Sequence, residues 1–213
     1  MAEKKRDVRA TRKRSGPEVR RQAVLDAALS TFAEKGFANA RIEDIARAAG
    51  VGKGTVYLYF PDKESLFKSL VGTYLTPHIE QASRFFETPS QSPRATLSAF
   101  YSLIQNEVLN TERADLVRLM ITEMPTFPEI AQFYHDNLIE PAMQLVQRLL
   151  AVAHERGELR SPHALKAPQM VAAPIVMSVV WGSLFANFGT LDRQAAFELS
   201  LDTLFRSPAE DTP

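Results

Sequence analysis

Residues 36–66 read GFANARIEDIARAAGVGKGTVYLYFPDKESL, and this stretch carries the clearest pattern in the chain. Apolar side chains recur at helical spacing in residues 42–49, and the pattern stops at Gly50. A second short helix is expected to begin near Gly52 and to end before Pro61. Two short helices joined by a glycine turn predict a helix-turn-helix unit.

The second of these helices has two different faces. Val56 and Phe60 lie four residues apart and are predicted to face inward, whereas Lys53 and Tyr57 share another face. Gly54 has no Cβ atom and lets the backbone approach a surface closely. A basic and aromatic face on such a helix suits the major groove of DNA. The alternative is a surface helix whose tyrosines fill a gap between domains.

The flanking segments also follow helical patterns. One helix is expected from Ser15 or Gly16 to Gly36, and Asp62 is expected to cap a long fourth helix that Pro77 kinks. Further helical patterns occupy residues 94–110, 112–123, 128–156, 164–188 and 192–206. Because no strand pattern and no repeat accompany them, the predicted fold class is all-α, with a three-helix head joined to a larger helical bundle.

The charges are distributed unevenly along the chain, which indicates that its two parts have different functions. Residues 1–60 contain 13 Lys and Arg against 7 Asp and Glu, and the remainder contains 12 against 18. A basic front predicts a polyanionic partner for that part. The expected domains are a basic arm (1–16), a DNA-binding domain (17–62), a larger helical domain (63–208) and a tail (209–213). The arm either follows DNA phosphates or serves as a solvated tail.

The opening stretch resembles the DNA-binding head of TetR/AcrR-type transcriptional regulators. The shared motifs are Gly36-Phe37, Ile45-Ala46, Ala49-Gly50-Val51, the run from Gly54 to Phe60, and Lys63-Glu64-Ser65-Leu66. The resemblance implies a set of DNA-facing residues, namely Lys53, Gly54, Thr55, Tyr57, Tyr59 and Lys63. Arg41 stands where this family often has Ser or Thr, and it is expected either to contact a phosphate or to be solvated.

The middle of the chain is rich in large, adaptable apolar side chains. Such side chains either form ordinary core or line an apolar pocket, which in this family binds an effector. The predicted pocket residues are Phe85, Phe86, Phe100, Tyr101, Ile104, Met120, Met124, Phe127, Phe133, Tyr134, Met143 and Trp181. Residues 116–141 are also weakly similar to AcrR- and AefR-like members, which implies a hydrophobic or aromatic effector.

The C-terminal segment predicts a dimer interface. Residues 167–191 carry no charge over 25 positions, which indicates a buried helix, with a membrane span as the alternative. Small residues recur every four positions there, and the last helix offers an apolar face. The predicted interface residues are Ser178, Gly182, Ala186, Phe197, Leu201, Leu204 and Phe205. The alternative is that these helices only complete the core of one chain.

Other classes of protein are disfavoured. The chain has no cysteine, which favours a reducing cytoplasm and excludes thiolate metal sites. The histidines at 78, 135, 154 and 163 are scattered, and no catalytic or dinucleotide motif occurs, so no enzyme activity, metal or cofactor is expected. The sequence therefore predicts a cytoplasmic DNA-binding protein. The resemblance implies a homodimeric regulator, and specifically a repressor released from a palindromic operator by a small hydrophobic or aromatic effector. The alternative is a ligand-independent DNA-binding or architectural factor, or an activator, of the same fold.

Overall fold

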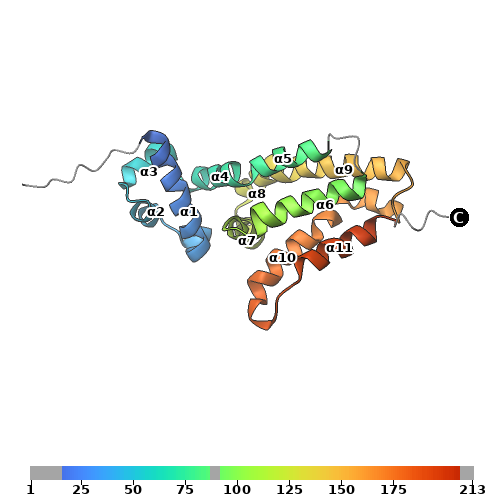
Figure 1. Ribbon diagram of the computed structural model, residues 1–213. Helices are drawn as coiled ribbons and strands as arrows, with labels where there is room; N and C mark the ends of the chain where they lie inside the picture. Colours follow the sequence, from blue (N-terminus) through green and yellow to red (C-terminus); the bar gives the residue numbers. More distant parts are fainter. Residues whose placement is uncertain (1–15, 87–91, 207–213) are drawn as a thin grey trace, which may run out of the picture.

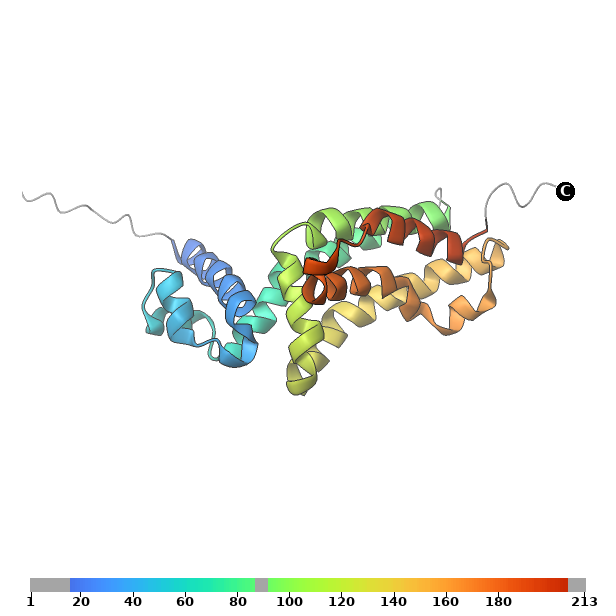
Figure 2. The same cartoon turned by 90° about the horizontal axis from the view of Figure 1, so that it is seen from below.

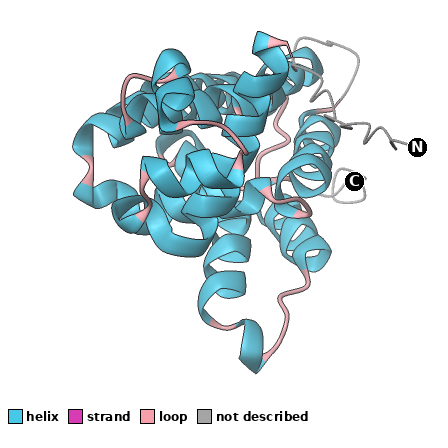
Figure 3. Cartoon of the chain, turned by 90° about the vertical axis from the view of Figure 1, so that its left-hand side faces the viewer, coloured by secondary structure: helices cyan, strands magenta, loops and turns pink. Residues whose placement is uncertain are grey.

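The structure is a computed structural model that describes residues 16–86 and 92–206. Within these ranges the chain forms helices and no strand, apart from one isolated antiparallel bridge between Leu159 and Phe205 (Figure 3). The predicted all-α fold is confirmed. The expected arm, except for residue 16, and the expected tail lie outside the described residues.

Three helices form a head at one end of the molecule (Figure 1). They are α1 (Pro17–Asn39), α2 (Ile42–Ala48) and α3 (Lys53–Tyr59). Helix α4 (Lys63–Tyr74) leads from this head into the bundle. The first turns of α4 also complete the core of the head, because Phe67 packs edge-on against Phe32 and Phe37 of α1.

Within the described residues, seven further α-helices and several short turns build the bundle, in which α10 and α11 lie side by side along one flank (Figure 2). The α-helices are α5 (Thr76–Phe86), α6 (Pro93–Ile104), α7 (Arg113–Glu123), α8 (Pro128–Tyr134), α9 (Glu140–Glu155), α10 (Ala173–Leu184) and α11 (Arg193–Leu204). The π-helical turns are η1 (Gln105–Leu109) and η3 (His135–Ile139), and the 3₁₀ turns are η2 (Met124–Thr126), η4 (Pro162–Lys166), η5 (Pro168–Ala172) and η6 (Ala186–Phe188).

Local signals at the helix ends behave as predicted. Gly16 is the N-cap of α1, and Gly36 interrupts that helix with φ 76° and ψ 161°. Asp62 caps α4 by accepting a hydrogen bond of 2.6 Å from the backbone N–H of Ser65. These signals act over three or four residues, and the sequence therefore places them correctly.

The predicted kink in the fourth helix is a complete break. Helix α4 ends at Tyr74, Leu75 caps it, and α5 starts at Thr76. Pro77 lies in the first turn of α5, where its missing N–H leaves no helical hydrogen bond unmade.

The predicted helix over residues 164–188 is wrong in its first part. Residues 162–172 form two 3₁₀ turns, and the α-helix begins only at Ala173. Proline explains the difference, because Pro168 and Pro174 lack N–H donors and disfavour helical geometry in the residue before each of them. Among the residues that the structure describes, no helix has both the length and the apolar character that a membrane crossing needs.

Candidate functional site

Helix α3 presents one buried face and one exposed face. Val56 is fully buried and Phe60, the C-cap residue, is 2% exposed. Tyr57 is 44% exposed, and Lys53 is exposed one turn before it. The predicted division of α3 into a core face and an outer face is therefore confirmed.

The first turn of α3 leaves room for a close approach from outside. A Cβ atom built on Gly54 meets no protein atom within 4 Å, so the fold itself does not require glycine there. Gly52 caps the helix without a side-chain hydrogen bond. The outer surface of this turn is consequently bare backbone, which suits close contact with a DNA strand.

A neighbouring carboxylate holds Lys53 on this outer surface. Its Nζ lies 2.5 Å from Oε1 of Glu43 in α2 and 5.6 Å from the centre of the Tyr57 ring. The hydrogen bond to Glu43 raises the pKa of Lys53, so the ammonium is charged. Because both side chains are half exposed, this ion pair contributes little to stability. Lys53 is therefore able to exchange Glu43 for a phosphate or a base edge.

Three other residues that are predicted to contact DNA lie around this surface and differ in solvent exposure. Arg41 is exposed at the N-cap position of α2. Thr55 is partly buried in the first turn of α3. Tyr59 packs partly buried beside Phe60, with ring centres 6.3 Å apart. Arg41 is the most accessible of the three, and all three contacts stay predictions.

The structure places Lys63 in a different role from the predicted DNA contact. Its Nζ donates to three backbone carbonyls at the end of α1, those of Phe37, Ala38 and Ala40, at 2.6, 3.0 and 3.1 Å. The ammonium also lies 4.6 Å from the centre of the Phe37 ring, and burial lowers the pKa of Lys63. All three donors are used inside the head, which corrects the expectation for this residue.

An apolar pocket of about 260 Å³ lies inside the bundle. Among the predicted pocket residues, Phe100, Ile104, Tyr134 and Met143 line it. The other lining residues are Leu75, His78, Ile79, Val108, Val117, Ile121, Leu138, Ile139, Ala142, Val146, Val171, Ala172, Ile175 and Val176. Most of these lining residues are aliphatic, whereas the predicted pocket residues are mainly aromatic residues and methionines. Helical periodicity marks them as apolar without separating pocket from core.

The remaining predicted pocket residues pack elsewhere. Met120 and Met124 are core, and Phe85 and Phe86 are partly buried against it. Tyr101 is also core, since its ring stacks on Phe197 and its hydroxyl donates to the carbonyl of Val171 at 2.8 Å. The expectation that these residues line the pocket is corrected, because neighbours within the chain already fill their surroundings.

Two other predicted pocket residues lie at the junction of head and bundle. Phe127 packs edge-on against Phe37 of α1 at 4.8 Å between ring centres. Phe133 lies under Nζ of Lys68 in α4, at 5.7 Å. Neither lines the pocket, and both instead hold the two parts of the molecule together.

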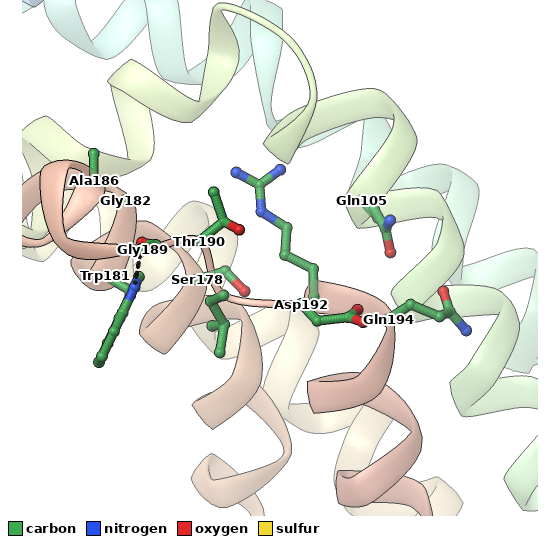
Figure 4. Close-up of a pocket in the computed structure, with 11 residues that line it drawn as sticks. Gln105, Ser178, Trp181, Gly182, Ala186, Gly189, Thr190, Asp192 and Gln194 are labelled. Carbon is green, nitrogen blue, oxygen red and sulfur yellow. Dashed lines mark hydrogen bonds between the residues drawn. The ribbon is translucent and has the colours of Figure 1, made fainter.

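Trp181 lines a second hollow, of about 430 Å³, between α10, the loop that follows it and the start of α11 (Figure 4). Its indole N–H donates to the carbonyl of Gly189 at 3.0 Å. Polar side chains, including Gln105, Asp192 and Gln194, also line the hollow. Trp181 is therefore not part of the apolar pocket.

The predicted dimer residues divide into two groups. Phe197, Leu201 and Phe205 are at most 2% exposed, so they belong to the core of the chain itself and the prediction for them is wrong. Ser178 is also buried and donates to the carbonyl of Pro174, while Leu204 is partly buried. Gly182 and Ala186 are exposed. The large apolar side chains that stay exposed between the start of α10 and the end of α11 are Val176, Met177, Leu184, Phe185, Phe188 and Leu199, and we call them the open surface of α10, η6 and α11.

Helix α7 links the pocket to the head. Val117 and Ile121 line the pocket. From the same helix, Arg118 donates to the carbonyl of Ala33 at 2.9 Å, and Glu123 accepts from the backbone N–H of Ala38 at 3.0 Å. Short-range sequence patterns give no sign of this contact by Glu123, because its partner lies 85 residues away.

In comparison with known protein families, the head and the bundle match two separate profiles. Residues 24–70 match the profile described as "Bacterial regulatory proteins, tetR family". Residues 88–196 match the profile described as "Tetracyclin repressor-like, C-terminal domain". The two matches cover the head and most of the bundle.

Individual relatives agree with these profiles. The chain is 32% identical over 175 residues to the HTH-type transcriptional repressor BepR of Brucella suis biovar 1, which covers 77% of this chain and 78% of BepR. The structure of NalD, the secondary repressor of the MexAB-OprM multidrug efflux pump in Pseudomonas aeruginosa, superposes with a TM-score of 0.75 at 23% identity, covering 90% of this chain and 100% of NalD. FadR of Bacillus subtilis, solved with stearoyl-CoA, gives a TM-score of 0.70 at 22% identity, covering 85% and 98%.

Proposed function

The chain belongs to the TetR family of bacterial transcriptional regulators, and we propose that it is a repressor released from a palindromic operator by a small, largely apolar effector. The family consists of regulators, so the expectation that the chain is not an enzyme is confirmed. Since its target is DNA, we place the protein in the cytoplasm. Repression is supported by the relatives BepR and NalD, which are both named repressors.

The pocket supports an apolar effector. Two of the helices that contribute to its wall also contact the head. Leu75, at the end of α4, lines the pocket, and so do residues of α7. A ligand that favours one arrangement of these helices changes DNA affinity by its difference in affinity for the two arrangements. FadR, of similar fold, was solved with stearoyl-CoA, whose acyl chain is apolar.

We assign the DNA contacts to the outer surface of the head. Lys53, Gly54 and Tyr57 form its centre, with Arg41, Thr55 and Tyr59 around it. The DNA-binding unit extends into α4, because Phe67 belongs to the core of the head. The rest of the described chain forms the effector-binding and dimerisation unit.

One experiment tests the proposed function as a whole. The purified protein is footprinted on the DNA upstream of its own gene, with and without a panel of apolar compounds. We expect a protected palindromic site that at least one compound releases. Protection that no compound changes would favour the ligand-independent factor, and stimulated transcription from a bound promoter would favour an activator.

A homodimer would present two copies of α3 to two half-sites about one DNA turn apart. We propose that the partner covers the open surface of α10, η6 and α11, where Leu184, Phe188 and Leu199 are 63%, 84% and 68% exposed. Because α10 and α11 pack side by side, we infer that these exposed apolar side chains form one interaction surface.

Replacing Leu199 with glutamate is expected to dissociate this dimer while each chain stays folded. The residue is exposed, so the new charge meets solvent in the monomer and an apolar surface in the dimer. Analytical ultracentrifugation should show that the dissociation constant of the dimer rises by at least about tenfold. Gln147→Glu, an exposed position on α9, is the matched control and should stay dimeric. A Leu199→Glu variant with unchanged dimer affinity would place the interface elsewhere.

A further inference from the structure

Two polar side chains line the apolar pocket, those of His78 and Tyr134, and Nδ1 of His78 has no hydrogen-bond partner in the described part of the chain. We propose that the effector carries a single hydroxyl group on an apolar body, and that the imidazole of His78 recognises this hydroxyl. The inference rests on the proposed function, because it names the ligand class of the same pocket.

His78 is partly buried, and one of its ring nitrogens is in an unusual state. Its Nδ1 is closed off from solvent and has no hydrogen-bond partner in the described part of the chain. Buried polar atoms in proteins are nearly always paired, so an unpaired one needs an explanation. Tyr101 shows the ordinary outcome nearby, since its hydroxyl bonds to the carbonyl of Val171 and lies 3.1 Å from Oγ of Ser200.

A second polar side chain lines the same pocket. Tyr134 makes no side-chain hydrogen bond within residues 16–86 and 92–206, and burial raises the pKa of its hydroxyl to about 12. The group therefore stays protonated and remains able to donate. Every other lining residue of this pocket is apolar. The pocket thus offers a hydrocarbon surface with two polar groups for orientation, as ligand sites commonly do.

The charge state of His78 selects the chemistry of its partner. Burial lowers the pKa of His78, and the positive charge of Arg113 lowers it further, against an opposing effect of Glu107. A neutral imidazole has one donor and one acceptor, and a hydroxyl group has both as well. A carboxylate only accepts and would need a charged imidazole for its strongest contact. The neutral imidazole therefore matches an alcohol or a phenol, whose hydroxyl group donates one hydrogen bond and accepts another.

The position of His78 connects recognition to the head. It lies in the first turn of α5, and its backbone N–H donates to the carbonyl of Leu75 at 3.1 Å, across the break between α4 and α5. Leu75 is the C-cap of α4, which runs into the head. A ligand that hydrogen-bonds to His78 therefore acts at the joint that orients the DNA-binding unit.

The test uses three matched probes, namely naphthol, naphthalene and naphthoate, titrated calorimetrically into the full chain. We expect wild-type protein to bind naphthol about tenfold more tightly than naphthalene, with naphthoate weaker than naphthol. His78→Leu removes the unpaired group and keeps the site apolar, so it should lose most of the preference for naphthol over naphthalene. His78→Gln keeps a donor and an acceptor and should retain part of the preference.

Each outcome bears on a different statement. Equal binding of naphthol and naphthalene by wild-type protein overturns the inference and leaves the apolar pocket in place. A tenfold preference that persists in His78→Leu overturns the role of His78, and tightest binding of naphthoate overturns the ligand class. If none of the three probes binds, the inference and the apolar effector of the proposed function fail together.

Discussion

Replacing Gly36 with alanine is expected to destabilise the protein by about 2–3 kcal/mol. Gly36 has φ 76° and ψ 161°, a region that only glycine occupies without strain. A Cβ atom there would lie 2.5 Å from Oε1 of Glu123. Relieving this clash displaces the carboxylate that accepts from the N–H of Ala38, so the contact between head and bundle weakens as well.

Urea denaturation of purified protein measures this loss. Gly72→Ala is the matched control, because Gly72 lies inside α4 and a Cβ atom there meets nothing within 4 Å. The control should gain about 0.5–1 kcal/mol, as alanine usually does in place of glycine within a helix. Equal denaturation midpoints for wild-type protein and Gly36→Ala would show that the strain at Gly36 is relieved without cost.

Replacing Lys53 with alanine is expected to lower DNA affinity by about 10- to 100-fold per half-site, if the lysine reads a base edge. Lys53 lies at the start of α3 on the surface that faces outward, and an exposed carboxylate is its partner in the free protein. Binding to DNA replaces that partner with a phosphate or with guanine. The effect therefore appears in DNA affinity and not in thermal stability.

Binding titrations at several salt concentrations separate the two possible DNA partners. Loss of a phosphate contact reduces the salt slope by about 1 and weakens all sequences alike, whereas loss of a guanine contact relaxes specificity at one position. Glu43→Gln removes the negative charge beside Lys53 and should bind DNA at least as tightly as wild-type protein. Unchanged affinity in Lys53→Ala would remove α3 from the proposed interface.

Lys63→Met extends this comparison within the head. Since the ammonium of Lys63 already serves three carbonyls of the protein, its loss should lower stability and leave the salt slope of DNA binding unchanged. A reduced slope would restore the DNA contact that the resemblance implied for this residue.

The sequence alone was sufficient for the head and for most helices. The core positions Val56 and Phe60, the cap at Asp62 and the stop at Gly36 depend on neighbours three or four residues away. Such local rules leave a readable pattern in one chain. The same motif carried the resemblance to the TetR family, which the comparisons confirm.

The sequence could not choose among apolar faces in the bundle. Helix α11 has apolar residues on two sides, with Phe197 and Leu201 directed into the core and Leu199 exposed. Periodicity identifies both sides as apolar, and only the position of the neighbouring helices decides which one is buried. For that reason the dimer face predicted for α11 contains the buried residues Phe197 and Leu201 and omits the exposed Leu199.

The pocket and the junction depend on contacts between distant parts of the chain. His78 and Tyr134 line one cavity, and Glu123 reaches Ala38 from 85 residues away. Lys63 shows the same dependence, because the carbonyls that occupy it belong to the preceding helices. Short-range spacing determined the helices, their ends and the outer face of α3. Only the packing of those helices decided which side chains form core, cavity or open surface, because that outcome depends on partners that local sequence does not encode.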